Sequence, residues 1–217
     1  MESRISAIEP QERRQGRSNV FINGKFALGV FDEVVLALGL RVGQAITAEY
    51  LEEIAQAETA RRAREDAYYF LGYRARSEKE VRDKLRRKEY DDAVIENTIT
   101  FLREQKLLDD TEFAERWVQA RGQTRGRRAL AFELRQKGVD AQIATETLDA
   151  AKDDDSEIAS ALQAARKKVG DAPTDSSREA QARLSAFLQR RGFGWDTIRP
   201  VLAQLYTPGQ NGQDFET

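Results

Sequence analysis

The chain has 217 residues, of which 40% are hydrophobic and 33% are charged, and its 35 basic and 37 acidic side chains leave a net charge of −2. Because it contains no histidine and no cysteine, the composition excludes imidazole bases, cysteine nucleophiles, disulfides and zinc sites with nitrogen or sulfur ligands, whereas chemistry that uses carboxylates alone stays open. No apolar run reaches the roughly 20 residues that a membrane-spanning helix needs, and the first residues lack a signal-peptide pattern, so we expect a cytoplasmic protein.

Residues 1–57 carry strand signals that the rest of the chain lacks. Asn23-Gly24 separates two apolar runs and favours a β-hairpin, because both residues accept the positive φ of a type I′ turn. Residues 4–8 could add a third strand, since a lone hairpin is only marginally stable. A short helix is expected over 33–38, and a longer helix is expected to begin at Ala48. The sequence therefore predicts a small module with a hairpin or a three-stranded sheet.

From about residue 63 to residue 206, one helical unit occurs three times. Its middle helix has two apolar residues four apart, then a basic residue and a closing apolar residue: Val81, Leu85, Lys88 and Tyr90; Leu130, Leu134, Lys137 and Val139; Leu184, Leu188, Arg191 and Phe193. The copies are offset by 49 and then 54 residues. Such periodicity indicates an array in which each unit buries its apolar face against its neighbours.

We therefore predict a mainly α fold of tandem three-helix repeats in an elongated array, preceded by the N-terminal module. The predicted boundaries place repeat one at 58–108, repeat two at 109–155, repeat three at 156–206 and a disordered tail at 207–217. Arrays of this kind usually act as extended binding surfaces, so we expect the protein to bind a partner along its surface and not a small ligand in a pocket.

Capping signals predict where helices begin. In a capping box, a serine or aspartate oxygen accepts from the backbone N–H three residues on, and a glutamate there reaches back. We expect such boxes at Ser77 with Glu80, Asp109 with Glu112 and Ser176 with Glu179, and aspartate caps at Asp91 and Asp140.

Other signals concern helix ends and turns. The second helix of repeat two is expected to follow Gly126, and Gly138 and Gly192 are expected to end middle helices. Pro200 is expected in the first turn of the last helix, where proline is tolerated. The run 153–155 lacks the glycine and terminal glutamate of a calcium loop, so we interpret it as a solvated linker.

Basic residues are concentrated in repeats one and two, with eleven against five acidic residues over 61–88 and seven against one over 116–137. Solvated helix faces would explain either block alone. However, Lys79, Arg82 and Arg86 form one stripe on their helix, and Arg128 and Arg135 occupy the positions of Lys79 and Arg86 in repeat two. Repeat three has lost most of this stripe.

We therefore predict an anionic partner lying across repeats one and two, either a phosphate backbone or an acidic protein surface. No stacking aromatic is expected between the basic residues, and nothing resembles a zinc finger or an RRM motif, so sequence-specific DNA reading is not expected. The predicted partner-binding residues are Arg74, Arg76, Lys79, Arg82, Arg86, Arg87, Lys88, Arg121, Arg125, Arg127, Arg128, Arg135 and Lys137.

Four spaced motifs carry a resemblance to a known family. They are L-x-x-R-x-R-S-x-x-E-V at 71–81, L-x-x-K at 85–88, D-D-x-x-F-A at 109–114 and L-x-x-E-L-x-x-K-G-V at 130–139. Together with the runs around them, over 68–110, 113–121 and 127–139, they resemble the RecX family of recombination regulators. The resemblance is dense in repeats one and two and weaker in repeat three, and some longer members carry an N-terminal hairpin module.

The resemblance implies an elongated, curved monomer that binds along the groove of the RecA filament on single-stranded DNA. It further implies inhibition of strand exchange, ATP turnover and co-proteolytic repressor cleavage, and thus a place in DNA recombination, repair and the SOS response. The acidic net charge and weakly basic third repeat leave the share of direct DNA contact open.

Two alternatives remain. The chain could be a general DNA-binding protein that acts independently of a recombinase. It could also be a metal-dependent enzyme that uses Asp109, Asp110 and Glu112, although helix capping explains these carboxylates better, so no catalytic residue, metal or cofactor is expected. The N-terminal module either adds a contact or caps the apolar end of the array, and we favour capping.

Overall fold

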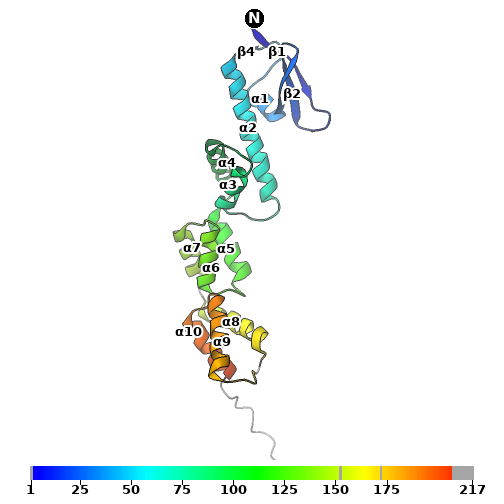
Figure 1. Cartoon of the computed structure of the whole chain (residues 1–217). Coiled ribbons are helices and arrows are strands. Elements are labelled where there is room, and N and C mark those ends of the chain that lie inside the picture. The colour runs from blue at the N-terminus through cyan, green and yellow to red at the C-terminus, as the bar shows by residue number, and fades with distance from the viewer. Residues whose placement is uncertain (1, 152, 172, 207–217) are drawn as a thin grey trace, which may run out of the picture. The chain divides into compact units, whose positions relative to one another are not determined.

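The computed structural model describes residues 2–151, 153–171 and 173–206, and the tail predicted at 207–217 lies outside the described residues. The chain forms two compact units (Figure 1). Of the described residues, the first unit contains 2–76 and 81–108, and the second contains 77–80 and those from 109 to 206.

The N-terminal module is an antiparallel sheet with the strand order β3-β2-β1-β4. The strands are β1 (Ser3–Pro10), β2 (Arg17–Ile22), β3 (Lys25–Phe31) and β4 (Ala45–Ile46). The predicted hairpin is confirmed, because Asn23 and Gly24 turn between β2 and β3 with φ of 49° and 78°. The predicted third strand is confirmed as β1. The fourth strand was not predicted, because two residues are too few to show an alternating pattern.

Two helices complete this module, α1 (Asp32–Ala37) and the long α2 (Ala48–Leu71). Ile5, Val20 and Ile54 lie at the centre of its core and are at most 1% exposed. The first part of α2 packs beside the sheet and its last part packs beside α4, as Figure 1 shows. A single helix thus links the β module to the helical part of the first unit.

The helical part of the first unit is built from the end of α2 with α3 (Glu78–Arg86) and α4 (Asp92–Glu104). Val81 and Leu85, predicted as core, are fully buried. They pack against the apolar face of α4, including Ile95 and Ile99.

From Asp109 to Tyr206, apart from the two positions not described, the second unit forms six helices with two separate apolar cores. These helices are α5 (Asp110–Arg121), α6 (Arg127–Gln136), α7 (Ala141–Ala150), α8 (Asp154–Val169), α9 (Arg178–Arg190) and α10 (Trp195–Tyr206). The predicted apolar positions of both middle helices are buried, namely Leu130, Leu134, Val139, Leu184, Leu188 and Phe193. The predicted three-helix repeats are therefore confirmed.

Helix starts agree with the capping signals in part. Asp109 accepts from the backbone N–H groups of the first turn of α5, and Asp140 does the same for α7. Ser77 accepts from the Glu80 N–H at 3.3 Å. Asp91 occupies the cap position of α4, but its side chain accepts no capping hydrogen bond.

Three predictions about helix ends are wrong. Ser177, and not Ser176, caps α9, because its hydroxyl accepts from Ala180 N at 3.2 Å. Residues 153–155 are not a linker, since Asp153 caps α8 and the two aspartates after it form the first turn of that helix. Pro200 is the sixth residue of α10 and therefore lies beyond its first turn.

In the described part of the second unit, two joints have the same design, and each lies at the N-terminal end of a middle helix. In one, the Ser77 hydroxyl donates to the Lys137 carbonyl at 2.6 Å, at the end of α6. In the other, Gly126 N donates to the Arg191 carbonyl at 2.9 Å, at the end of α9. The donors are 49 residues apart and the acceptors 54, which are the repeat offsets. The joints therefore belong to the repeat itself, and each satisfies backbone groups that a helix end leaves unpaired.

Candidate functional site

Two members of the stripe predicted on α3, Arg82 and Arg86, form ion pairs with α4. Arg82 donates to the two oxygens of Glu96 at 2.9 and 2.8 Å, and this contact lowers the pKa of Glu96 below its ordinary value. Arg86 donates to Asp92 at 3.3 Å, and both side chains are more than half exposed. Exposed pairs contribute only about 0–1 kcal/mol, so Arg86 can exchange its carboxylate for another anion at little cost.

The cations at the end of α3 are held differently. Lys88 pairs with Asp66 of α2, whose other carboxylate oxygen accepts from the Tyr90 hydroxyl at 2.8 Å. Burial of the Tyr90 hydroxyl raises its pKa, and the hydrogen bond to Asp66 raises it further. Arg87 is exposed and donates to the carbonyl of Asp83 at 3.1 Å.

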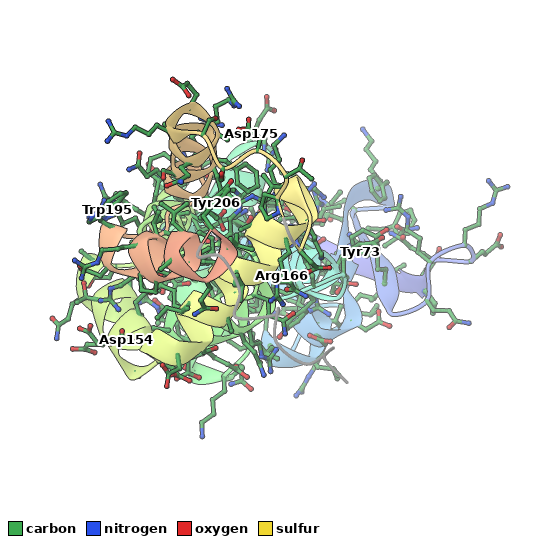
Figure 2. The ribbon with its side chains drawn as sticks, turned by 90° about the horizontal axis from the view of Figure 1, so that it is seen from below. Tyr73, Asp154, Arg166, Asp175, Trp195 and Tyr206 are labelled. Atoms are coloured by element: carbon green, nitrogen blue, oxygen red, sulfur yellow. The ribbon has the colours of Figure 1, made fainter. Side chains whose placement is uncertain are left out.

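The two arginines before α3 have different surroundings. The Arg76 guanidinium lies 4.0 Å from the centre of the Phe70 ring, and Arg74 is exposed. Tyr69, in the last turn of α2, and Tyr73, just after that helix, meet edge to face and are 69% and 65% exposed. Tyr73 is labelled in Figure 2. The Tyr73 hydroxyl donates to Tyr69, which raises the pKa of Tyr73. This exposed pair was not predicted, because tyrosines four apart on a helix are equally typical of a core.

In repeat two, Glu133 of α6 gathers several of the predicted residues. Its carboxylate lies 2.8 Å from Arg121 Nε and 3.5 Å from Arg125 Nε, and it accepts from Trp117 Nε1 at 2.9 Å. Arg121 and Lys137 each lie 5.0 Å from the centre of the Trp117 ring. Two arginines share one carboxylate, so this cluster keeps a net positive charge.

Two lysines take part in the joint between residues 77–80 and the end of α6. Lys137 pairs with Glu80 at 2.7 Å, and the aliphatic stem of Lys79 lies against Gly138. Lys137 therefore serves the packing of the second unit as well as its charge.

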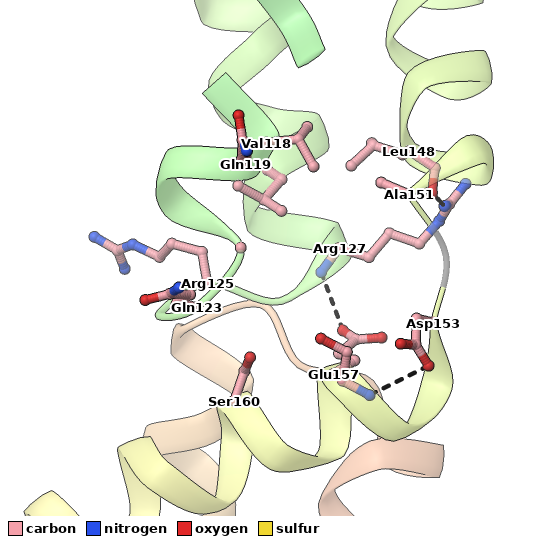
Figure 3. A pocket seen from close by; sticks show the side chains of 13 residues that line it. Val118, Gln119, Gln123, Arg125, Arg127, Leu148, Ala151, Asp153, Glu157 and Ser160 are labelled. Carbon is pink, nitrogen blue, oxygen red and sulfur yellow. Dashed lines mark hydrogen bonds between the residues drawn. The ribbon is translucent and has the colours of Figure 1, made fainter. Parts of the chain in front are cut away.

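Arg127 lies beside a cavity of about 230 Å³, which Figure 3 shows from close by. Its guanidinium pairs with Asp149 at 2.7 Å and donates to the Leu148 carbonyl, while its backbone N–H donates to Glu157 at 3.2 Å. It thus joins α6, α7 and α8. The lining carries both signs of charge, so the cavity has no clear preference for an anion.

Arg128 and Arg135 lie on the solvent side of α6, roughly opposite the buried Leu130 and Leu134. Both are exposed, and within the part of the chain that the structure describes neither guanidinium has a carboxylate partner. Between them stands Phe132, which is 55% exposed. The expectation that no stacking aromatic separates the basic residues is therefore wrong. The spacing of 128, 132 and 135 would have revealed Phe132, since it falls on the helix face opposite the two leucines.

The predicted residues of repeat two thus occupy two sides of α6. Arg121, Arg125 and Lys137 are brought together around Glu133 and Trp117, whereas Arg128 and Arg135 are not part of that cluster. Binding of a partner by either group stays a prediction.

The carboxylates considered for metal chemistry have other contacts. Asp109 caps α5, Asp110 accepts from Glu78 N at 2.8 Å, and Glu112 pairs with Arg116. Within residues 2–206, apart from the two positions not described, no three such side chains gather into a group that could hold a metal ion. None of the described helices has the length and apolar content to cross a bilayer.

Models of four RecX domains match the chain in order. They are the N-terminal domain at residues 3–47 and the first, second and third three-helix domains at 63–102, 109–148 and 155–202. A protein of Bacillus velezensis named Regulatory protein RecX is 35% identical over 214 residues, which cover 98% of this chain and 80% of the relative. The chain belongs to the RecX family.

Other RecX relatives agree with this assignment. Regulatory protein RecX of Clostridium acetobutylicum is 29% identical over 210 residues, covering 95% of this chain and 98% of the relative. A crystal structure of regulatory protein RecX aligns with a TM-score of 0.76 at 25% identity, covering 92% of this chain and 98% of that one. RecX from Lactobacillus salivarius aligns with a TM-score of 0.62 at 28% identity, covering 69% and 97%. The predicted family and the predicted fold class are both confirmed.

Proposed function

We propose that this protein regulates the RecA recombinase by binding the filament that RecA forms on single-stranded DNA, and that it inhibits strand exchange, ATP hydrolysis and co-protease activity. The observation that carries this proposal is the match to all four RecX domains in order, together with relatives named Regulatory protein RecX along nearly the whole chain. The proposed regulator acts by binding and not by catalysis.

The distribution of charge supports an anionic partner. The net charge is −2, yet the α5–α6 segment holds seven basic residues against one acidic residue over 116–137. Screening by salt limits exposed charges to a range of about 10 Å, so a partner meets this local excess and not the net charge. Arginine at such positions binds phosphate or carboxylate through its planar fork.

The predicted contact residues can be ranked by the ion pair that each must give up to bind a partner. Arg128 and Arg135 are exposed and lack a carboxylate partner within the described residues, so a partner gains their charge without breaking an ion pair. Arg86 must give up a weak exposed pair. Arg82 must give up a two-point contact with Glu96 and is therefore the poorest of these candidates.

The test is the RecA ATPase stimulated by single-stranded DNA, measured with increasing amounts of this protein. We expect the wild-type chain to lower the steady-state rate and the double variant Arg128→Glu, Arg135→Glu to need about tenfold more protein for the same effect. A matched control is Arg178→Glu, Arg190→Glu on α9, which makes the same charge change at exposed arginines of repeat three. Circular dichroism establishes that both variants fold.

The two rival functions predict other results. A general DNA-binding protein would bind oligonucleotides with a steep salt dependence and would affect the ATPase only by competing for DNA, so excess DNA would abolish its effect. If the wild-type chain leaves the ATPase unchanged at saturating concentration, regulation of RecA is wrong. If both double variants lose inhibition equally, the assignment to α6 is wrong.

A further inference from the structure

Three exposed side chains of α6 lie along one face of the helix. Arg128, Phe132 and Arg135 have the spacing i, i+4 and i+7, and at about 100° per residue Phe132 is within about 40° of Arg128 and about 60° of Arg135 around the axis. The two arginines are about 10 Å apart along the axis, from a rise of about 1.5 Å per residue. The aromatic ring therefore lies between two cations on the surface.

This face is not needed by the repeat fold. Repeat one has Asp83 and repeat three has Ala186 at the position of Phe132, as the offsets of 49 and 54 residues show. The core of repeat two is filled by other side chains, such as Leu130 and Leu134 on the opposite face. The phenyl ring is 55% exposed, so about half of its surface is available for a contact outside the chain.

The surroundings of the ring are cationic. Glu133, the only acidic residue between 127 and 136, is turned toward Trp117 and Arg121 on another side of the helix. Among the described residues, Phe132 is the only large apolar side chain exposed on α6. A protein partner would be expected to meet a broader apolar patch around such a ring.

Single-stranded nucleic acid offers the two features that this face can use. An unpaired base presents a flat face that stacks on an aromatic ring, and the phosphates on either side of it are anions that arginine binds. A duplex keeps its bases stacked on one another, so it offers phosphates but no base face.

We propose that Arg128, Phe132 and Arg135 form a contact site for single-stranded DNA, in which one base stacks on Phe132 and the neighbouring phosphates bind the two arginines. The inference rests on the proposed function, since it assigns this face to the DNA strand of the filament. The proposed site would make direct contact with DNA, and the sequence alone did not establish how much such contact contributes.

The test measures binding of the full-length chain to a fluorescent oligo(dT) of about 15 nucleotides by anisotropy, with no recombinase present. Phe132→Ala is expected to weaken binding about tenfold, as loss of one stacked base does, and to leave the slope of log K against log salt unchanged. Phe132→Trp is expected to restore binding, because it keeps a stacking ring. Arg128→Ala, Arg135→Ala is expected to reduce the slope by about 1.4, since each phosphate contact of a single strand contributes about 0.7.

The matched control is Trp195→Ala, which removes a ring that is 53% exposed at the start of α10, a helix of repeat three (Figure 2). This variant is expected to bind like wild type. The same oligonucleotide as a duplex is expected to bind Phe132→Ala and wild type equally.

Three results would overturn the proposal: no measurable binding of wild type to oligo(dT) at low salt, equal binding of Phe132→Ala and wild type, or an equal loss for single strand and duplex. Should Phe132→Ala bind oligo(dT) normally and yet fail to inhibit the RecA ATPase, the ring contacts protein and the base-stacking site is wrong. Because the oligonucleotide assay contains no RecA, its failure is distinct from failure of the proposed function.

Discussion

Glu89, Gly138 and Gly192 occupy the same place in the three repeats, just after the middle helix, and all three have positive φ, at 63°, 80° and 87°. The sequence pattern alone identified the glycines as helix ends. It could not predict Glu89, because a glutamate carries no signal for a conformation that costs a residue with a Cβ about 1–2 kcal/mol. In repeat one this residue therefore carries strain that the two glycines avoid.

Substitutions at these positions should differ in a defined order. A Cβ at Gly192 would lie 2.3 Å from the Ala129 nitrogen, whereas at Gly138 it would meet the flexible side chain of Lys79. We expect Gly192→Ala to lower the free energy of unfolding by at least about 2 kcal/mol, Gly138→Ala by about 1–2, and Glu89→Gly to change it by less than about 1. Urea titration followed by circular dichroism measures each effect. A midpoint for Gly192→Ala equal to that of wild type would show that the joint tolerates a side chain.

In the candidate site, too, the sequence predicted the residues but not their contacts. The basic residues were evident from composition and from the repeat offset. Their ion pairs were not, because these depend on which carboxylates the fold brings near each basic side chain. Arg82 and Arg128 belong to related stripes, yet one is held by Glu96 and the other has no carboxylate partner in the described part of the chain.

At the scale of elements, helices with a strong apolar period were predicted well and short or polar elements were not. The middle helices α3, α6 and α9 follow from leucines or valines four residues apart. Strand β4 has two residues and forms only because β1 offers it an edge, so nothing local could reveal it. The start of α8 was missed because three aspartates in a row suggest solvation, whereas negative charge in the first turn also stabilises a helix.

One contact between elements that no pattern predicted is the ion pair of Arg17 on β2 with Glu58 on α2. The atoms are 2.6 Å apart, the side chains are 12% and 5% exposed, and the second Glu58 oxygen accepts from Phe31 N at 2.8 Å. Arg17 also lies over the Phe31 ring. The carboxylate thus ties the helix to two strands at once.

Removing this carboxylate should destabilise the N-terminal module. We expect Glu58→Ala to cost about 3–5 kcal/mol, because it leaves the buried Arg17 charge uncompensated. Glu53→Ala, at an exposed position of the same helix, is the control and should have little effect. Both tryptophans, Trp117 and Trp195, belong to the second unit, so their fluorescence should report an unchanged urea transition while far-ultraviolet circular dichroism reports an earlier loss of structure. Equal dichroism curves for the two variants would contradict the assigned role.

At the scale of the whole molecule, repeats two and three are not independent of each other. In the second unit, Gly126 N donates to the Arg191 carbonyl, Arg128 N donates to the Gly192 carbonyl, and Arg127 N donates to Glu157. These bonds connect repeat two to repeat three through backbone groups that each repeat alone would leave unpaired. In a repeat array, contacts between neighbours carry a large share of the stability.

Repeats two and three should therefore unfold together. Each contains one tryptophan, so the variants Trp117→Phe and Trp195→Phe report on repeat three and repeat two separately. In each variant, we expect the fluorescence of the remaining tryptophan and the circular dichroism to give the same urea midpoint. Comparing the two signals within one variant removes the effect of the substitution itself on stability. Gly192→Ala, which disturbs the joint, should separate the two transitions, because the coupling passes through that turn. If the transitions already differ in the unperturbed joint, the backbone bonds at Gly126 and Arg128 do not couple the repeats, and each folds on its own.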